Sequence, residues 1–124
     1  MIEVKKLFKS FGNKNVLNGI SFKIEKGESV AIIGKSGIGK SVLLKHLIGL
    51  VKPDSGEVWV ENQLVNSLSF NKLQTIRSNC GMVFQFGALF DSMTVKDNIG
   101  LALSKLTKMD RAAVNHRIDE CLNA

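Results

Sequence analysis

The clearest chemistry in this chain lies in one uninterrupted run of residues: Gly34, Lys35, Ser36, Gly37, Ile38, Gly39, Lys40 and Ser41. The run fits the pattern G-x-x-x-x-G-K-[ST], a loop that binds phosphate groups. Glycines have no Cβ, so the backbone can turn and point successive N–H groups at one phosphate. Lys40 would reach the outer phosphates as a point charge, and the Ser41 hydroxyl would be a ligand for Mg²⁺, which prefers oxygen. The run predicts a site for the phosphates of a nucleotide.

The segments on either side of this loop agree with the motif. Residues 29–33 are apolar and β-branched and predict a buried strand. Residues 42–48 pair apolar side chains at i,i+4 and predict a helix with one buried face, ended by Gly49. The donors of residues 37–41 would then lie at the positive end of that helix, which attracts anions. These flanks favour the motif over an ordinary glycine-rich turn with a surface lysine.

The rest of the chain predicts short strands followed by helices. Residues 2–8 predict a strand, residues 12–15 a turn, and residues 20–24 and 58–60 further strands, the last antiparallel to the early ones. Residues 80–84 predict a second core strand. Together they predict an α/β core preceded in the chain by a region rich in β-strands.

The helices after the first core strand are placed by their caps and apolar spacing. Ser69 predicts the start of a short helix. Thr94 with Asp97 resembles a capping box, with Asp in place of the usual Glu. Asp110 predicts the start of a last helix, along which apolar residues recur at i,i+4.

Composition sets the broad class. The chain has 124 residues, enough for one domain, and 44% of them are apolar. The formal net charge is +6, but the lysines are scattered and form no dense block, which favours a solvated surface over nucleic-acid binding. Cys80 and Cys121 fit no metal or redox spacing and are expected to be reduced thiols in the cytoplasm.

The chain resembles the N-terminal half of the ATP-binding subunit of ABC transporters. The resemblance is carried by residues 34–41 as Walker A, by Pro-Asp-Ser-Gly-Glu at 53–57, by Val-Phe-Gln at 83–85 as the Q-loop, and by residues 94–99. It implies an incomplete P-loop NTPase (RecA-like) core with an antiparallel β subdomain in residues 1–93 and the start of a helical subdomain in residues 94–124. Residues 85–95 are similar to the Mla/Mce branch, which moves phospholipids and other lipids across bacterial envelopes.

The resemblance implies a site for ATP and Mg²⁺ and roles for further residues. Phe11 would stack on adenine with Val16 nearby, although a phenylalanine in the core of a hairpin is an equal alternative. Gln85 would complete the Mg²⁺ shell with Ser41 and sense the γ-phosphate. Val42 stands where a second hydroxyl residue is frequent, and its N–H can still bind phosphate. The contacts to a membrane-spanning permease subunit would come from Phe86, Gly87, Ala88, Leu89 and Phe90.

The resemblance also implies a head-to-tail dimer with a second ATP-binding subunit, on the cytoplasmic face of the inner membrane. Nothing in the 124 residues matches the signature loop Leu-Ser-Gly-Gly-Gln, and no apolar run ends in Asp-Glu as Walker B. Asp91 is interpreted as a loop residue, and His46 and His116 as structural or exposed. Residues 1–124 alone are therefore expected not to hydrolyse ATP and to leave a sheet edge unpaired.

Other classes remain open. A GTPase needs Asn-Lys-x-Asp, and residues 71–74 end in glutamine instead. A nucleoside kinase needs an arginine-rich lid, whereas the arginines are Arg77, Arg111 and Arg117. A short non-catalytic nucleotide-binding or partner-binding module, or a decayed fragment, is the alternative from a different class.

Overall fold

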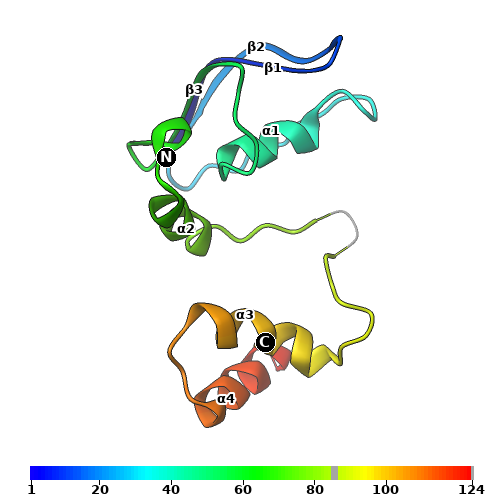
Figure 1. Cartoon of the computed structure of the whole chain (residues 1–124), viewed down its shortest axis with the longest axis vertical. Coiled ribbons are helices and arrows are strands. Elements are labelled where there is room, and N and C mark those ends of the chain that lie inside the picture. The colour runs from blue at the N-terminus through cyan, green and yellow to red at the C-terminus, as the bar shows by residue number, and fades with distance from the viewer. Residues whose placement is uncertain (85–86, 124) are drawn as a thin grey trace. The chain divides into compact units, whose positions relative to one another are not determined.

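The computed structural model describes residues 1–84 and 87–123, which fall into two compact units, Met1–Gly81 and Met82–Ala124 (Figure 1). The first unit holds a sheet and two α-helices. The second holds two further helices. Each unit is described by itself.

The first unit is organised by a four-stranded antiparallel sheet of order β2-β1-β3-β4. Its strands are β1 (Ile2–Phe11), β2 (Lys14–Ile24), β3 (Ser55–Val60) and β4 (Gln63–Leu64). β1 and β2 form a hairpin whose turn contains Gly12, at φ +56°. The strands predicted from residues 2–8, 20–24 and 58–60 are confirmed, as is the antiparallel pairing of the last with the first.

A bulge in β1 sets which side chains reach the core. Val4 and Leu7 are both fully buried although they are three residues apart, an odd spacing that a regular strand would place on opposite faces. The register shifts between them, and Lys6 adopts φ +45°. The Lys6 N–H donates to the Ser21 hydroxyl at 2.8 Å, which satisfies a backbone group that the bulge would otherwise leave without a partner.

The core of the first unit joins this sheet to the helices α1 (Lys40–Leu47) and α2 (Phe70–Ser78) and to a short 3₁₀ turn, η1 (Val65–Ser67). The sheet contributes one set of buried side chains, and the helical segments contribute Leu43, Val65 and Ile76. The helix predicted after the glycine loop is confirmed, and so is the start of α2 at Ser69. Ser69 occupies the N-cap position without a side-chain cap hydrogen bond.

The second unit is a pair of helices, α3 (Val95–Leu106) and α4 (Arg111–Leu122). Both predicted caps are confirmed: the Thr94 hydroxyl accepts from the Asp97 N–H at 3.1 Å, and the Asp110 carboxylate accepts from the Ala113 N–H at 2.8 Å. A Cβ at Gly100 would lie 3.1 Å from Ile118 Cδ1, so the missing side chain lets α3 approach α4 closely. Ile118 is correspondingly buried.

The predictions of two buried core strands are wrong for the described chain. Residues 28–35 and 80–84 adopt no regular structure, and Ile33 and Val83 are 93% and 91% exposed. A strand is held by hydrogen bonds to its neighbours, and parallel strands find those neighbours far along the chain. Among the described residues no strand pairs with either segment. Over residues 1–84 and 87–123 the structure therefore holds an antiparallel sheet and flanking helices, without the two predicted core strands.

Two further observations concern the cysteines and the helices. Both cysteines are free, Cys121 exposed and Cys80 half-buried. In the parts of the chain that the structure describes, no helix is both long and apolar enough to cross a membrane.

Candidate functional site

The glycine loop packs against the β1–β2 hairpin and leads directly into α1. Gly37 and Gly39 adopt φ +76° and +107°, conformations that L side chains rarely adopt. A Cβ on Gly39 would lie 2.7 Å from Val16 Cγ1 and 3.0 Å from the Val16 carbonyl oxygen. Gly39 is also the N-cap of α1, so the contact with Val16 fixes where the helix begins. Position 39 thus requires glycine for both its conformation and its space.

Lys40 folds back over the loop that precedes it. Its Nζ donates to the carbonyl oxygens of Gly34 and Lys35 at 2.6 and 2.8 Å. The first turn of α1 contains no acidic residue, so nothing there offsets the positive end of the helix. The ammonium group therefore lies over the loop that leads into the N-terminus of α1, and both are groups that attract an anion.

The other loop residues divide between solvent and core. Lys35, Ser36, Ile38 and Ser41 are exposed, and the Ser41 hydroxyl makes no hydrogen bond within the described chain. Val42 is half-buried and packs on the core of the first unit. The apolar residue at a position that often carries a hydroxyl therefore helps to anchor α1.

A cleft of about 280 Å³ opens beside the loop. Its walls come from β2, from the segment before the loop and from α1, and they include Val16, Ile32, Ile33 and Lys40. The isoleucines that were predicted to lie in a buried strand line this cleft instead. Apolar walls next to an anion site are what a ligand with a charged and an uncharged part requires.

A comparison with family models matches residues 17–124 to the family described as ABC transporter. The chain belongs to the ABC transporter family. This ABC chain is 41% identical over 125 residues to the chloroplastic protein TRIGALACTOSYLDIACYLGLYCEROL 3 of Arabidopsis thaliana, covering 100% of the chain and 36% of the relative. It is 43% identical over 122 residues to the methionine import ATP-binding protein MetN of Legionella pneumophila (strain Lens), covering 98% of the chain and 36% of that protein.

Solved ABC structures share the fold. The dimeric structure of MJ0796, a bacterial ABC transporter cassette, has a TM-score of 0.88 and 34% identity, over 99% of this chain and 56% of that one. The structure of cbiO1 from Clostridium perfringens, part of the ABC transporter complex cbiONQ, has a TM-score of 0.79 and 29% identity, over 98% and 49%. The ABC chain thus spans about a third of the curated relatives and about half of the solved chains.

Phe11 ends β1 next to the hairpin turn of this ABC chain. Its side chain is 50% exposed, and Lys9 Nζ lies 5.3 Å from the ring centroid. The ring is outside the buried core, which leaves a face open to stacking. Val16 lies across the hairpin in β2, against Gly39.

Gln85, which is expected to be the Q-loop glutamine, and Phe86 lie outside the described residues. The segment that follows begins with positive φ at Gly87 and Ala88, +72° and +53°. Leu89 and Phe90 are 70% and 54% exposed. The segment is held to α3 by the side chain of Asn98, a role that the sequence did not reveal because asparagine in a helix is most often a surface residue.

The histidines differ from each other. His46 is buried in α1, where Nδ1 lies 2.7 Å from the Val42 carbonyl oxygen. His116 is exposed on α4 and lies 3.4 Å from Glu120.

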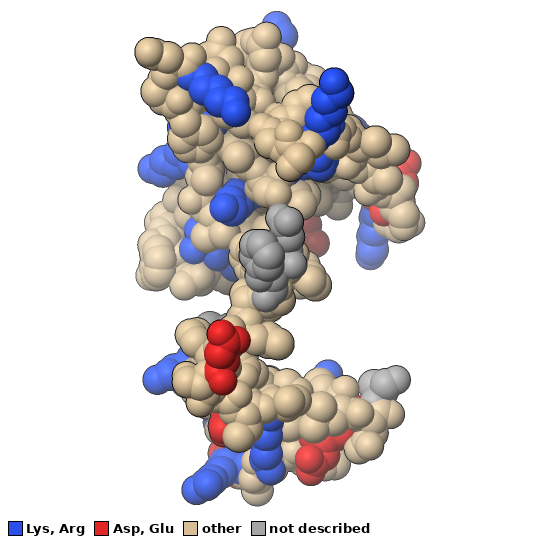
Figure 2. Space-filling model, turned by 90° about the vertical axis from the view of Figure 1, so that its right-hand side faces the viewer, with Lys and Arg blue, Asp and Glu red and all other residues tan. Residues whose placement is uncertain are grey.

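In the described ranges no cluster of three metal-binding side chains occurs. Lysine and arginine side chains are scattered over the face shown in Figure 2 without forming a continuous basic patch.

Proposed function

We propose that this chain binds Mg-ATP as the nucleotide-binding part of an ABC transporter ATPase subunit. The observation that carries the proposal is the convergence of Lys40, the N-terminus of α1 and the glycine backbone of the loop beside the cleft. A nucleotide triphosphate needs many donors that approach it closely, and this loop provides backbone groups without Cβ atoms in the way.

The chain's own residues would divide the nucleotide between them. Residues 37–41 would donate backbone N–H groups to the β-phosphate, and Lys40 would exchange its two carbonyl partners for phosphate oxygens. The exposed Ser41 hydroxyl would hold Mg²⁺ together with Gln85. Phe11 would stack on adenine, with Val16 at its side. When bound, Mg²⁺ would neutralise phosphate charge.

The test measures ATP binding by the full-length protein with calorimetry, in the presence of Mg²⁺. Lys40→Ala should weaken binding by about tenfold or more, since a charge-assisted hydrogen bond contributes about 1.5–3 kcal/mol. Lys52→Ala removes the same charge from an exposed position just beyond α1 and should leave affinity unchanged. Equal affinity of wild type and Lys40→Ala would contradict the proposal. Preferential binding of GTP would point to a different class of NTPase.

Hydrolysis is a separate question from binding. Water and γ-phosphate must be positioned by a carboxylate, and residues 1–124 contain no apolar run ending in Asp-Glu. A polypeptide of these residues is therefore expected to release phosphate no faster than its own Lys40→Ala variant. Turnover well above that variant would show that a carboxylate within these residues, such as Asp91, serves instead.

The partners we propose are a membrane-spanning subunit, contacted by residues 86–90, and a second ATP-binding subunit in a head-to-tail dimer. The exposed Leu89 and Phe90 support the first contact, because exposed apolar side chains in one loop suit a protein interface. With these partners, the location we propose is the cytoplasmic face of the inner membrane, and nucleic acid is not among the proposed partners.

The transported substrate we propose is a phospholipid or another lipid. Residues 85–95 resemble lipid transport ATPases, and the Arabidopsis relative bears the name of a galactolipid. Methionine import is the second candidate, because the MetN relatives are 38–43% identical. ATPase activity of the full-length protein assembled with its membrane subunit should rise with phospholipid and not with methionine. Stimulation by methionine alone would reverse the order of the candidates.

A further inference from the structure

The Pro-Asp-Ser-Gly-Glu segment at residues 53–57 carries part of the family resemblance, yet it holds none of the nucleotide contacts proposed for this chain. Asp54 lies just before β3 and forms three hydrogen bonds with the end of β1. Its N–H donates to the Phe8 carbonyl at 3.0 Å. Its carboxylate accepts the Lys9 ammonium at 2.7 Å through Oδ1 and the Ser10 N–H at 2.6 Å through Oδ2. Asp54 thus binds three consecutive residues of β1.

These contacts continue the sheet beyond the point where β3 stops. The pairing of β1 with β3 ends at Phe8 and Ser55. Among the described residues, the rest of β1 pairs only with β2, so its other edge would present backbone groups without a partner. The Asp54 carboxylate meets the Ser10 N–H, as a neighbouring strand would. The residue immediately before Phe11 is therefore held by Asp54 as well as by β2.

Lys9 joins Asp54 to the ring of Phe11. Lys9 Nζ binds Asp54 Oδ1 and lies over the Phe11 ring, 5.3 Å from its centroid. The Lys9 side chain is only 16% exposed, which limits the other positions open to the ammonium. A cation is attracted to the electron-rich face of an aromatic ring. The carboxylate therefore fixes the ammonium and the ammonium covers one face of the half-exposed ring, so the opposite face is left for a base.

We propose that Asp54 is a positioning residue for base recognition, which holds Lys9 and the end of β1 so that one face of Phe11 is open to adenine. The inference rests on the proposed function, because it explains how the ring named there is oriented. Asp54 touches no part of the nucleotide and acts through Phe11. Its loss should therefore weaken recognition of the base, whereas recognition of the phosphates by Lys40 and the glycine loop should persist.

The first test compares ATP with ribose 5′-triphosphate, which is ATP without its base, by calorimetry on the full-length protein with Mg²⁺. Wild type should prefer ATP by about fivefold or more, the scale of stacking one base on an aromatic side chain. Asp54→Ala should lower this preference by about two- to fivefold and leave the affinity for ribose 5′-triphosphate unchanged. Asp54→Asn keeps an acceptor for the Ser10 N–H and should fall between wild type and Asp54→Ala.

A matched control lies at the other end of β1. Lys5 Nζ lies 3.2 Å from Glu3 Oε2 and 5.7 Å from the centroid of the Trp59 ring, so an acid, a lysine and an aromatic ring meet there as well. Trp59 belongs to β3 and has no part in the proposed nucleotide site. Glu3→Ala should therefore keep the preference for ATP. A loss equal to that in Asp54→Ala would show a general effect on the sheet and overturn the inference.

Removing the ring shows whether Asp54 acts through it. Phe11→Ala sets the preference for ATP without stacking, and adding Asp54→Ala to this variant should lower the preference no further. A further fall in the double variant would overturn the inference. So would an unchanged preference in Asp54→Ala, or an equal loss of affinity for both ligands in that variant.

A second measurement needs no nucleotide. Amide exchange at Ser10 should rise by about tenfold in Asp54→Ala and stay at the wild-type rate in Glu3→Ala, because the carboxylate of Asp54 holds this N–H. Equal exchange at Ser10 in wild type and Asp54→Ala would show that the carboxylate does not hold the end of β1, which also overturns the inference.

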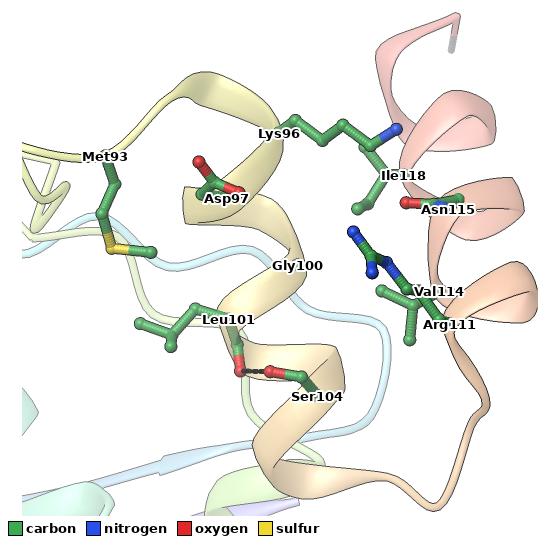
Figure 3. A pocket seen from close by; sticks show the side chains of 10 residues that line it. All are labelled: Met93, Lys96, Asp97, Gly100, Leu101, Ser104, Arg111, Val114, Asn115 and Ile118. Carbon is green, nitrogen blue, oxygen red and sulfur yellow. Dashed lines mark hydrogen bonds between the residues drawn. The ribbon is translucent and has the colours of Figure 1, made fainter.

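The triphosphates meet a second group of cationic side chains in the second unit. Figure 3 shows Lys96 and Arg111 among the residues that line a groove between α3 and α4. Binding that survives in Lys40→Ala belongs to such a region and is subtracted from each titration. Binding that depends on Lys40, with a preference for ATP that Asp54→Ala leaves intact, rejects the inference alone. Absence of binding that depends on Lys40 in wild type rejects the proposed function, and the inference with it.

Discussion

The side-chain amide of Asn98 holds the backbone of Phe90 from both sides. Asn98 Oδ1 accepts the Phe90 N–H at 2.8 Å, and Nδ2 donates to the Phe90 carbonyl at 3.2 Å. Nδ2 also lies 3.2 Å from the Met93 carbonyl oxygen and 3.0 Å from that of Thr94. One side chain thus closes the loop before α3 into a fixed turn. This turn presents the exposed side chains of Leu89 and Phe90, which form the proposed partner contact.

Replacing Asn98 should loosen this loop without unfolding the helices. Asn98→Ala removes both the acceptor and the donors, and amide exchange at Phe90 should rise by about tenfold, corresponding to roughly 1.4 kcal/mol of lost protection. Asn98→Asp keeps an acceptor for the Phe90 N–H and should retain part of the protection. Asn123→Ala removes an amide that donates to Asp119 at the other end of the unit and serves as the control. Unchanged exchange at Phe90 in Asn98→Ala would contradict the role.

The substitution Gly56→Ala tests the bulge that brings Leu7 into the core. A Cβ at Gly56 would lie 2.2 Å from the Lys6 carbonyl oxygen, and Gly56 has φ +92°. Gly27 has a similar φ of +89° with no atom within 4 Å of its Cβ position. Gly27→Ala should therefore cost about 1–2 kcal/mol from conformation alone. Gly56→Ala should cost more, because β1 must also move, and chemical unfolding of both variants measures the difference. Equal losses would show that the contact with β1 relaxes freely.

Replacing Arg77 tests the connection between α2 and the residues that follow the C-terminal end of α1. Its Nε donates to the Ile48 carbonyl and its Nη2 to the Gly49 carbonyl, each at 2.9 Å. Arg77→Lys keeps the positive charge but cannot donate to both carbonyls as the guanidinium fork of Nε and Nη2 does. It should lower the free energy of unfolding by about 1–2 kcal/mol. Arg117→Lys, on an exposed face of α4, should change it by less than about 0.5 kcal/mol. Similar values for both would contradict a special role for the fork.

The sequence predicts local features well in this chain and long-range pairing poorly. The caps at Thr94 and Asp110, the helix after the glycine loop and the antiparallel strands follow from residues that are close in sequence or joined by a hairpin. Residues 29–33 have the composition of a buried strand, but composition cannot provide the neighbouring strands that would pair with them. The bulge at Lys6 was also invisible, because it depends on Gly56 packing against β1 from fifty residues away.

The candidate site shows the same division. The backbone conformation of the glycine loop was predictable because the motif specifies it residue by residue, and Gly37 and Gly39 adopt positive φ. The role of Asn98 was not predictable. It depends on how the loop before α3 folds back onto that helix. Polar residues on a helix carry no signal in the sequence that separates such contacts from an ordinary solvated face.

Asp54 gives a prediction for pH. The hydrogen bond from Lys9 and that from the Ser10 N–H lower the pKa of its carboxyl below the ordinary value of 3.8. Because the pKa is lower in the folded protein, the ionised carboxylate stabilises the fold above the unfolded value, and this contribution is lost as pH falls through the folded pKa. Wild type should therefore exceed Asp54→Asn in unfolding stability at neutral pH, and the difference should begin to shrink as pH falls below about 3.8 and vanish only below the lower pKa of the folded protein. Asp91→Asn removes an exposed loop carboxylate and is the control. A difference between wild type and Asp54→Asn that persists unchanged into acid would show that the carboxylate's charge does not hold β1 to the segment before β3.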